Sequence, residues 1–209
     1  MTKPIIFYTN PMSRGRTVRW MLEEIGVPYR TEIVQYGAEM KGAAYTAINP
    51  MGKVPAIRHG DVVVTEQAAI VAYLADAFAD KGLVPPSGNP ARGAYYRWLF
   101  FTAAPAEYAA VDRSLGFIPE TQQDRSRVGY GSYEDVLNTL EQALAGTVFL
   151  AGNSFSAADL YMTAFLNFAM MTGAIEKRPA FEAYTARHIA RPAFQRAQQI
   201  DNDLMPKKD

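Results

Sequence analysis

The sequence predicts a mixed α/β half followed by an all-helical half. Within residues 1–80, short apolar runs typical of strands alternate with stretches of helical periodicity. Residues 84–90 (VPPSGNP) are rich in proline and small polar residues, which is typical of a linker, and no later stretch is typical of a strand. We therefore expect one domain over 1–80, a linker over 81–90 and a helical domain over 91–209.

The chain is predicted to begin with a strand, a loop and a helix. Residues 4–8 (PIIFY) form a short uncharged apolar run, and Asn10 and Pro11 mark a loop. A helix is expected over 14–25 and should end at Gly26. A second strand is suggested at Ile33-Val34. The apolar positions that predict the helix are spaced i, i+3, i+4, i+7: Val18, Met21, Leu22 and Ile25.

A hairpin with a proline at its start follows. Residues 56–59 and 62–64 read as its strands, with Gly60-Asp61 as the turn. Pro55 stands where a sheet tolerates proline, at the first residue of a strand. If the Val54-Pro55 bond is cis, the chain turns sharply and leaves the backbone groups of Val54 unpaired. A trans proline at a strand edge is the more common alternative.

The next helix begins with an acidic and a polar residue. Periodicity predicts a helix from Gln67, directly after Glu66. The unpaired N–H groups of a helix start can bind a carboxylate, and an acidic side chain there can bind an ammonium group. The start therefore suits the zwitterionic end of an amino acid. The alternative is that Glu66 only complements the helix dipole.

The second half is predicted to be helical throughout. We expect a long aromatic helix over 91–111 with a kink at Pro105, and a second helix over 123–144. Ser156 and Asp159 have capping-box spacing, with Asp in place of Glu, which predicts a third helix start. We interpret that feature as structural only.

Composition narrows the function classes. The 209 residues contain no cysteine, which excludes disulfides and a protein thiolate nucleophile. Only two histidines are present, so no metal site is predicted. The net charge is zero, so the sequence lacks the excess of basic residues that is typical of nucleic-acid-binding proteins. No apolar run is long enough to span a bilayer and no signal peptide is recognisable, so we expect a cytoplasmic protein without membrane partners.

Two segments carry a family resemblance. Residues 49–57 (NPMGKVPAI) and 65–70 (TEQAAI) resemble the glutathione-binding segment of the glutathione transferase family. The resemblance implies a thioredoxin-like α/β domain of βαβαββα order with a mixed sheet and a cis Pro55, then an all-α domain that carries the same Ser-x-x-Asp feature. Because no cysteine is present, the cysteine-type members of the family are excluded.

The resemblance also implies how glutathione, the co-substrate, is held. Val54 would pair with the cysteinyl backbone, Glu66 would bind the γ-glutamyl amino group, and Gln67 its carboxylate. Lys53 and Lys41 fall where the family places groups near the glycyl carboxylate. Many members have Ser or Thr where Gln67 stands, so the role of its side chain stays open.

The group that acts on the glutathione sulfur has more than one candidate. Ser13, in the first loop and near Arg14, matches the serine-type classes, and a hydroxyl beside a helix start can stabilise a thiolate. Tyr8 matches the tyrosine-type classes. Ser13 is the first candidate and Tyr8 the second, with an Arg14-assisted or backbone site as the third. Structural alternatives are an N-cap for Ser13 and a half-buried strand aromatic for Tyr8.

The predicted function is glutathione transfer to a small hydrophobic electrophile by a homodimer. An electrophile pocket is expected to use residues of the first loop and of the first helix after the linker. Aromatic residues at helical spacing more often pack in the core than line a pocket. The sequence therefore predicts no particular electrophile. The alternatives are glutathione-dependent peroxidase, dehalogenase or isomerase chemistry, or a non-enzymatic binding or assembly protein on this fold. The expected pocket residues are Met12, Phe101, Ala104 and Tyr108.

Overall fold

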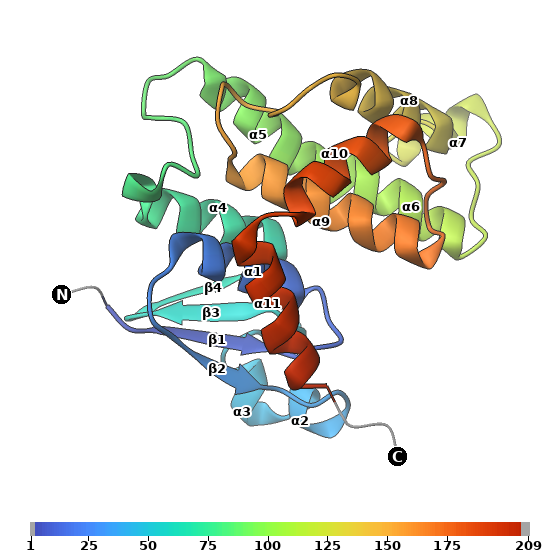
Figure 1. Cartoon of the computed structure of the whole chain (residues 1–209). Helices are drawn as coiled ribbons and strands as arrows, with labels where there is room; N and C mark the ends of the chain where they lie inside the picture. Colours follow the sequence, from blue (N-terminus) through green and yellow to red (C-terminus); the bar gives the residue numbers. More distant parts are fainter. Residues whose placement is uncertain (1–2, 206–209) are drawn as a thin grey trace. The chain divides into compact units, whose positions relative to one another are not determined.

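A computed structural model of the chain describes residues 3–205 (Figure 1). The chain forms two compact units. The first runs up to Lys81 and includes the segment that starts at Arg191, and the second is Gly82–Ala190.

The first unit is built on a four-stranded mixed sheet. Its strand order is β2-β1-β3-β4, with β1 parallel to β2 and antiparallel to β3, and β3 antiparallel to β4. The buried side chains of Ile5, Phe7 and Ile57 contribute to its core. The strands are β1 (Ile5–Thr9), β2 (Tyr29–Ile33), β3 (Ala56–His59) and β4 (Val62–Thr65).

The helices of the first unit confirm the expected thioredoxin-like order, with the second helix of that order divided in two. Helix α1 ends as predicted, since Gly26 takes the left-handed φ of 65° that glycine adopts readily. The second strand lies earlier than Ile33-Val34 suggested. The helices are α1 (Gly15–Ile25), α2 (Ala38–Lys41), α3 (Ala43–Thr46), α4 (Gln67–Ala77) and the 3₁₀ turn η1 (Ala79–Lys81).

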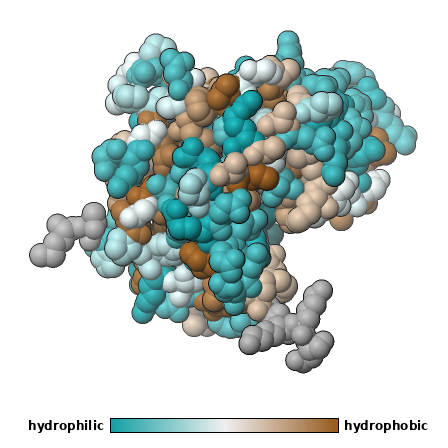
Figure 2. Space-filling model, in the orientation of Figure 1, coloured by the Kyte–Doolittle hydropathy of each residue, from teal (hydrophilic) through white to brown (hydrophobic). Residues whose placement is uncertain are grey.

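The last helix corrects the predicted domain division. Helix α11 (Pro192–Asp203) packs against α1 in the first unit, so the chain from Arg191 onward does not belong with the helical domain expected over 91–209 (Figure 1). A buried ion pair joins the two helices: Arg19 Nε lies 2.7 Å from Asp201 Oδ1, and both side chains are 1% exposed. The outward face of α11 is largely hydrophilic (Figure 2), and its buried residues are Ala193, Ala197 and Asp201.

The second unit is helical, and none of its residues lies in a strand. Within it, α9 packs against both α5 and α10. Its elements are α5 (Ala91–Phe101), the π-helical turn η2 (Thr102–Ala106), α6 (Glu107–Ser114), α7 (Gln122–Arg127), α8 (Tyr133–Leu144), α9 (Ala157–Thr172) and α10 (Pro179–Ile189).

The structure corrects one helix prediction in this unit, the single helix over 123–144, and gives the local geometry at Pro105 for another. Pro105 lies inside the π-helical turn η2, and helical backbone continues on both sides of it. Proline removes one N–H and crowds the preceding turn, which a wider turn accommodates. The helix expected over 123–144 is two helices, because Gly129 and Gly131 take φ values of 74° and 76° in the segment between α7 and α8.

The predicted capping box at the start of α9 is confirmed. The Ser156 backbone N–H donates to Asp159 Oδ2 at 2.9 Å, and the Ser156 side chain completes the reciprocal pair. The Tyr184 hydroxyl and the Leu150 N–H both donate to Asp159 Oδ1. The carboxylate therefore ties α10 and the segment before α9 to the helix start.

Removing Asp201 should destabilise the first unit, because it leaves the Arg19 charge buried without its partner. We expect Asp201→Ala to lower the free energy of unfolding by about 3–5 kcal/mol. Urea denaturation can follow this unit through Trp20 in a Trp98→Phe background, since Trp98 lies in the second unit. Glu32→Ala is the control, because it breaks the exposed Arg30–Glu32 pair and should cost about 1 kcal/mol or less. A similar loss of unfolding free energy in both variants would contradict the stabilising role of the buried Arg19–Asp201 pair.

Candidate functional site

Three segments of the first unit meet at one end of the sheet. Tyr8 of β1 lies opposite Ala56 of β3, and Ala56 lies opposite Thr65 of β4. Because β3 is antiparallel to both neighbours, the loop after β1, the Val54-Pro55 corner and Glu66 all emerge beyond this row. Adjacent strands are about 4.8 Å apart, so the row is about 10 Å wide, which suits an extended tripeptide.

The Val54-Pro55 corner presents a free backbone edge. The bond is cis, as the family resemblance implied, and β3 begins at Ala56. In the part of the chain that the structure describes, the Val54 N–H and C=O have no hydrogen-bond partner. An extended ligand backbone can therefore pair with Val54 as an additional strand would.

The carbonyl before this corner is held by two side chains that the sequence did not single out. The Tyr45 hydroxyl donates to the Lys53 carbonyl at 2.8 Å and Asn49 Nδ2 donates to it at 2.7 Å. Burial raises the pKa of Tyr45 to about 12, with a smaller contribution from the nearby Tyr8, so Tyr45 stays a donor at neutral pH. Asn49 lies within residues 49–57, the segment that carries the family resemblance. The hydrogen bond from its buried side chain to the Lys53 carbonyl gives a structural reason for an Asn there.

Glu66 has an unusual backbone conformation. Its φ is 66°, and it is the one non-glycine residue of the described chain with a positive φ. Its side chain is exposed and makes no contact with a cationic partner within residues 3–205. No side chain caps α4, so the first N–H groups of that helix, from Gln67 onward, are left for a ligand. Backbone strain of the kind that the positive φ of Glu66 implies is common at functional sites.

The first loop is organised by Asn10. Asn10 Nδ2 donates to the Val34 carbonyl at 3.1 Å, and its Oδ1 accepts from the Met12 N–H at 3.0 Å. The Ser13 hydroxyl donates to the Asn10 carbonyl at 2.7 Å and accepts from the N–H of Gly15, the first residue of α1, at 2.9 Å. Ser13 therefore lies at a helix start, and its proton is held by a neutral acceptor.

Gly15 is needed for this geometry. A side chain there would collide with the Thr9 hydroxyl at the end of β1.

Tyr8 lies beside the same corner. Its ring is 6.1 Å from the Tyr45 ring, and it packs with Val54 against a buried cluster that includes Val34 and Met40. Its hydroxyl makes no hydrogen bond within the described chain. The structure thus places both Ser13 and Tyr8 at the end of the sheet that carries the Val54 edge.

The two lysines lie near this corner, and both are exposed. Lys41 Nζ donates to the Met51 carbonyl at 2.9 Å, and Lys53 directly precedes Val54. With Glu66 they place positive and negative charge around the free backbone edge.

The expected electrophile-pocket residues are spread over both units. Met12 is 57% exposed on the first loop. In the second unit, Phe101 ends α5, Ala104 lies in the π-helical turn, and Tyr108 is 57% exposed on α6.

Among residues 3–205, no three side chains of metal-binding type gather closely enough to hold an ion. None of the described helices combines the length and the apolarity that crossing a membrane would require.

Comparison with known proteins agrees with this architecture. Family models described as "Glutathione S-transferase, N-terminal domain" and "Glutathione S-transferase, C-terminal domain" match residues 12–77 and 108–192. A tobacco (Nicotiana tabacum) relative, glutathione S-transferase APIC, is 31% identical over 169 residues, which cover 75% of this chain and 78% of the relative.

Solved structures agree as well. A glutathione transferase from Methylococcus capsulatus is 29% identical, with a TM-score of 0.76 and coverage of 95% of this chain and 98% of its own. A sphingomonad glutathione S-transferase, solved in complex with glutathione, is 26% identical, with a TM-score of 0.71 and coverage of 94% and 98%.

A mixed-sheet unit with a cis-proline corner, joined to a helical unit, defines the two-domain class of glutathione transferases. The chain belongs to the glutathione S-transferase family and is an enzyme of that family.

Glycine should relieve the backbone strain at Glu66. We expect Glu66→Gly to be more stable than Glu66→Ala by about 1–3 kcal/mol, because only glycine adopts this φ without cost. Thermal and urea denaturation of the ligand-free protein measure this difference. The matched control is Glu32 in β2, where Gly should instead be less stable than Ala by about 0.5–1 kcal/mol. The same sign at both positions would disprove the strain.

Proposed function

We propose that the protein binds glutathione at this end of the sheet, stabilises its thiolate and conjugates it to small hydrophobic electrophiles. The observation that carries the proposal is the unpaired backbone of Val54 beside the strained Glu66 and the uncapped start of α4. The glutathione complex of the sphingomonad relative supports the choice of ligand.

The charges of the site complement those of glutathione. The cysteinyl amide pairs with Val54, and Glu66 binds the γ-glutamyl ammonium. The γ-glutamyl carboxylate meets the N–H groups that begin at Gln67, where the helix dipole favours an anion. Lys41 and Lys53 supply positive charge for the glycyl carboxylate.

Ser13 is the proposed donor to the sulfur. A cysteine-type thiol has a pKa of about 8.5, and lowering it by about two units requires about 2.7 kcal/mol of preference for the thiolate. A hydrogen bond to a charged acceptor contributes about 1.5–3 kcal/mol, and a helix start about 0.3–1 kcal/mol. The Ser13 proton would leave the neutral Asn10 carbonyl for the anionic sulfur, while the Gly15 N–H continues to hold its oxygen.

Tyr8 is the second candidate donor. Its hydroxyl makes no hydrogen bond that would have to be given up, whereas the Ser13 proton is already engaged. Arg14, directly before α1, is the third candidate, through its positive charge.

The bound thiolate would then attack an electrophilic carbon and displace a leaving group such as chloride. Met12, Phe101, Ala104 and Tyr108 are the proposed apolar residues around the electrophile. A homodimer located in the cytoplasm completes the proposal.

Variants of Ser13 and Tyr8 test the donor. We expect Ser13→Ala to lower conjugation of a chlorodinitrobenzene at pH 7 by about threefold to 25-fold, because raising the thiol pKa from about 6.5 by one to two units lowers the thiolate fraction by that factor. The thiolate absorbance of bound glutathione should titrate at correspondingly higher pH. Ser114→Ala and Tyr36→Phe are the matched controls, because each removes an exposed hydroxyl. Both should leave the conjugation rate and the thiolate titration unchanged. Full activity in Ser13→Ala together with loss of activity in Tyr8→Phe would transfer the role to Tyr8.

A further inference from the structure

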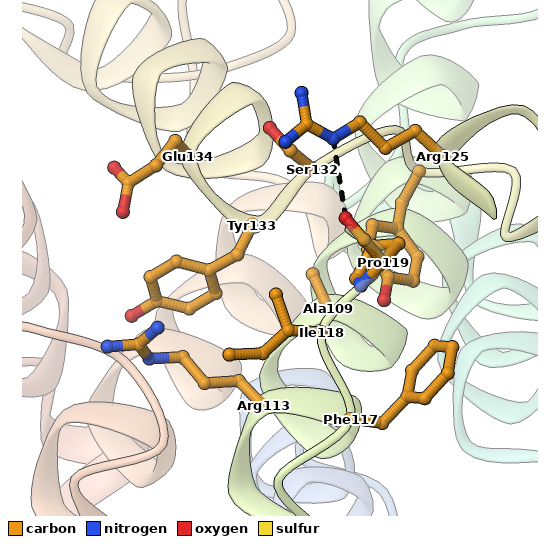
Figure 3. A pocket seen from close by; sticks show the side chains of 10 residues that line it. Ala109, Arg113, Phe117, Ile118, Pro119, Arg125, Ser132, Tyr133 and Glu134 are labelled. Atoms are coloured by element: carbon orange, nitrogen blue, oxygen red, sulfur yellow. Dashed lines mark hydrogen bonds between the residues drawn. The ribbon is translucent and has the colours of Figure 1, made fainter. Parts of the chain in front are cut away.

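A cavity of about 290 Å³ lies in the second unit, and none of the residues proposed above lines it (Figure 3). It is formed by α6, the segment between α6 and α7, α7 itself, the segment between α7 and α8, and the start of α8. A cavity of about 150 Å³ holds a benzene ring, so this one has room for two fused rings. Its lining includes Ala109, Arg113, Phe117, Ile118, Arg125 and Tyr133.

The cavity lies on a different side of α6 from Tyr108, the one residue of this helix proposed for the electrophile pocket. Successive residues of an α-helix are turned by about 100°, so Tyr108 points about 100° away from Ala109 and about 140° away from Arg113. Ala109 and Arg113 line the cavity and Tyr108 does not. The cavity is therefore a separate feature of α6.

Two arginines give the cavity a positive charge. Arg113 lies over the Tyr133 ring, with its guanidinium carbon 4.3 Å from the ring centroid, and Arg125 Nε donates to the Pro119 carbonyl at 3.3 Å. Neither arginine forms an ion pair with a carboxylate anywhere in residues 3–205. Stacking on a ring occupies the face of the Arg113 guanidinium and leaves its N–H edge for an anion.

The acidic groups nearby are already engaged. Glu134, which also lines the cavity, lies 3.3 Å from Arg178, which also pairs with other glutamates. The Asp112 carboxylate accepts the Tyr130 hydroxyl at 2.8 Å. Burial is the main reason that the pKa of Tyr130 rises to about 12, and burial also raises the pKa of Tyr133, so both tyrosines stay neutral.

Apolar side chains stand at the mouth of the cavity without covering partners. Phe117 is 50% exposed and Ile118 is 62% exposed, and Figure 3 shows Ile118 lying between the two arginine side chains. Exposed apolar side chains beside a cavity are typical of a ligand site.

We propose that this cavity binds a small aromatic carboxylate, with the rings against Phe117, Ile118 and Tyr133 and the carboxylate held by the arginines that line the cavity, Arg113 and Arg125. Both arginines can offer paired N–H groups to a carboxylate. The site does not depend on the glutathione proposal, since no residue is shared.

Naphthoate is the probe, and the full chain saturated with S-hexylglutathione is the protein, so that binding at a glutathione site does not contribute. Calorimetry should show one naphthoate per chain with a dissociation constant at or below about 1 mM. Arg113→Gln and Arg125→Gln should each weaken binding about tenfold, as expected for loss of a charge-assisted contact. Higher salt should also weaken it.

One control variant, one further variant and one control ligand make the test specific. Arg97→Gln removes another exposed arginine that lies over an aromatic ring, Trp98, and it should change the dissociation constant less than twofold. Ile118→Ser should weaken binding about fivefold, because it removes ring contact while the charge stays. The neutral naphthalenemethanol should bind at least tenfold more weakly than naphthoate. No saturable binding at millimolar naphthoate, or unchanged binding in both arginine variants, would overturn the proposal.

Discussion

The site depends above all on the register of the sheet. Pairing Tyr8 with Ala56, and Ala56 with Thr65, sets where each flanking segment leaves the sheet. A shift of one residue would turn every side chain of β3 to the opposite face. It would also move the Val54 edge away from Glu66 along the strand. The pairing of β1, β3 and β4 thus sets the geometry of the candidate site, and the segments that flank these strands supply its functional groups.

Interactions outside the strands keep the flanking segments rigid. Tyr45 and Asn49 hold the Lys53 carbonyl, so Val54 has little freedom to turn inward. Arg16 supports the first loop: its Nε donates to the Pro11 carbonyl at 2.6 Å, and its Nη1 donates to Gln198 of α11 at 2.7 Å. The last helix of the chain therefore supports the loop that carries Ser13, and the buried Arg19–Asp201 pair holds that helix in place.

Much of this could be predicted from the sequence where a local pattern has a local cause. The start of α4 at Gln67 and the capping box at Ser156 each follow from a few adjacent residues, whereas the cis bond at Pro55 was implied by the family resemblance and not by the local pattern, which left trans as the more common alternative. The packing of α11 could not be predicted, because it depends on Arg19 meeting Asp201 from 182 residues away. The role of Asn10 was also hidden, since an Asn-Pro pair indicates a loop but not that its amide joins two strand ends. The π-helical turn was not predicted, because helical periodicity and Pro105 indicate a disturbance of the helix but not the wider turn that accommodates it.

The most direct test of the central claim is calorimetry of glutathione against N-acetylglutathione, which lacks the γ-glutamyl ammonium. The account predicts saturable binding of glutathione at or below millimolar concentration and about tenfold weaker binding of the acetylated peptide, because Glu66 loses a charged partner. In Glu66→Gln the two ligands should bind alike. No binding of glutathione at millimolar concentration, or equal binding of both ligands to the unaltered protein, would contradict the account.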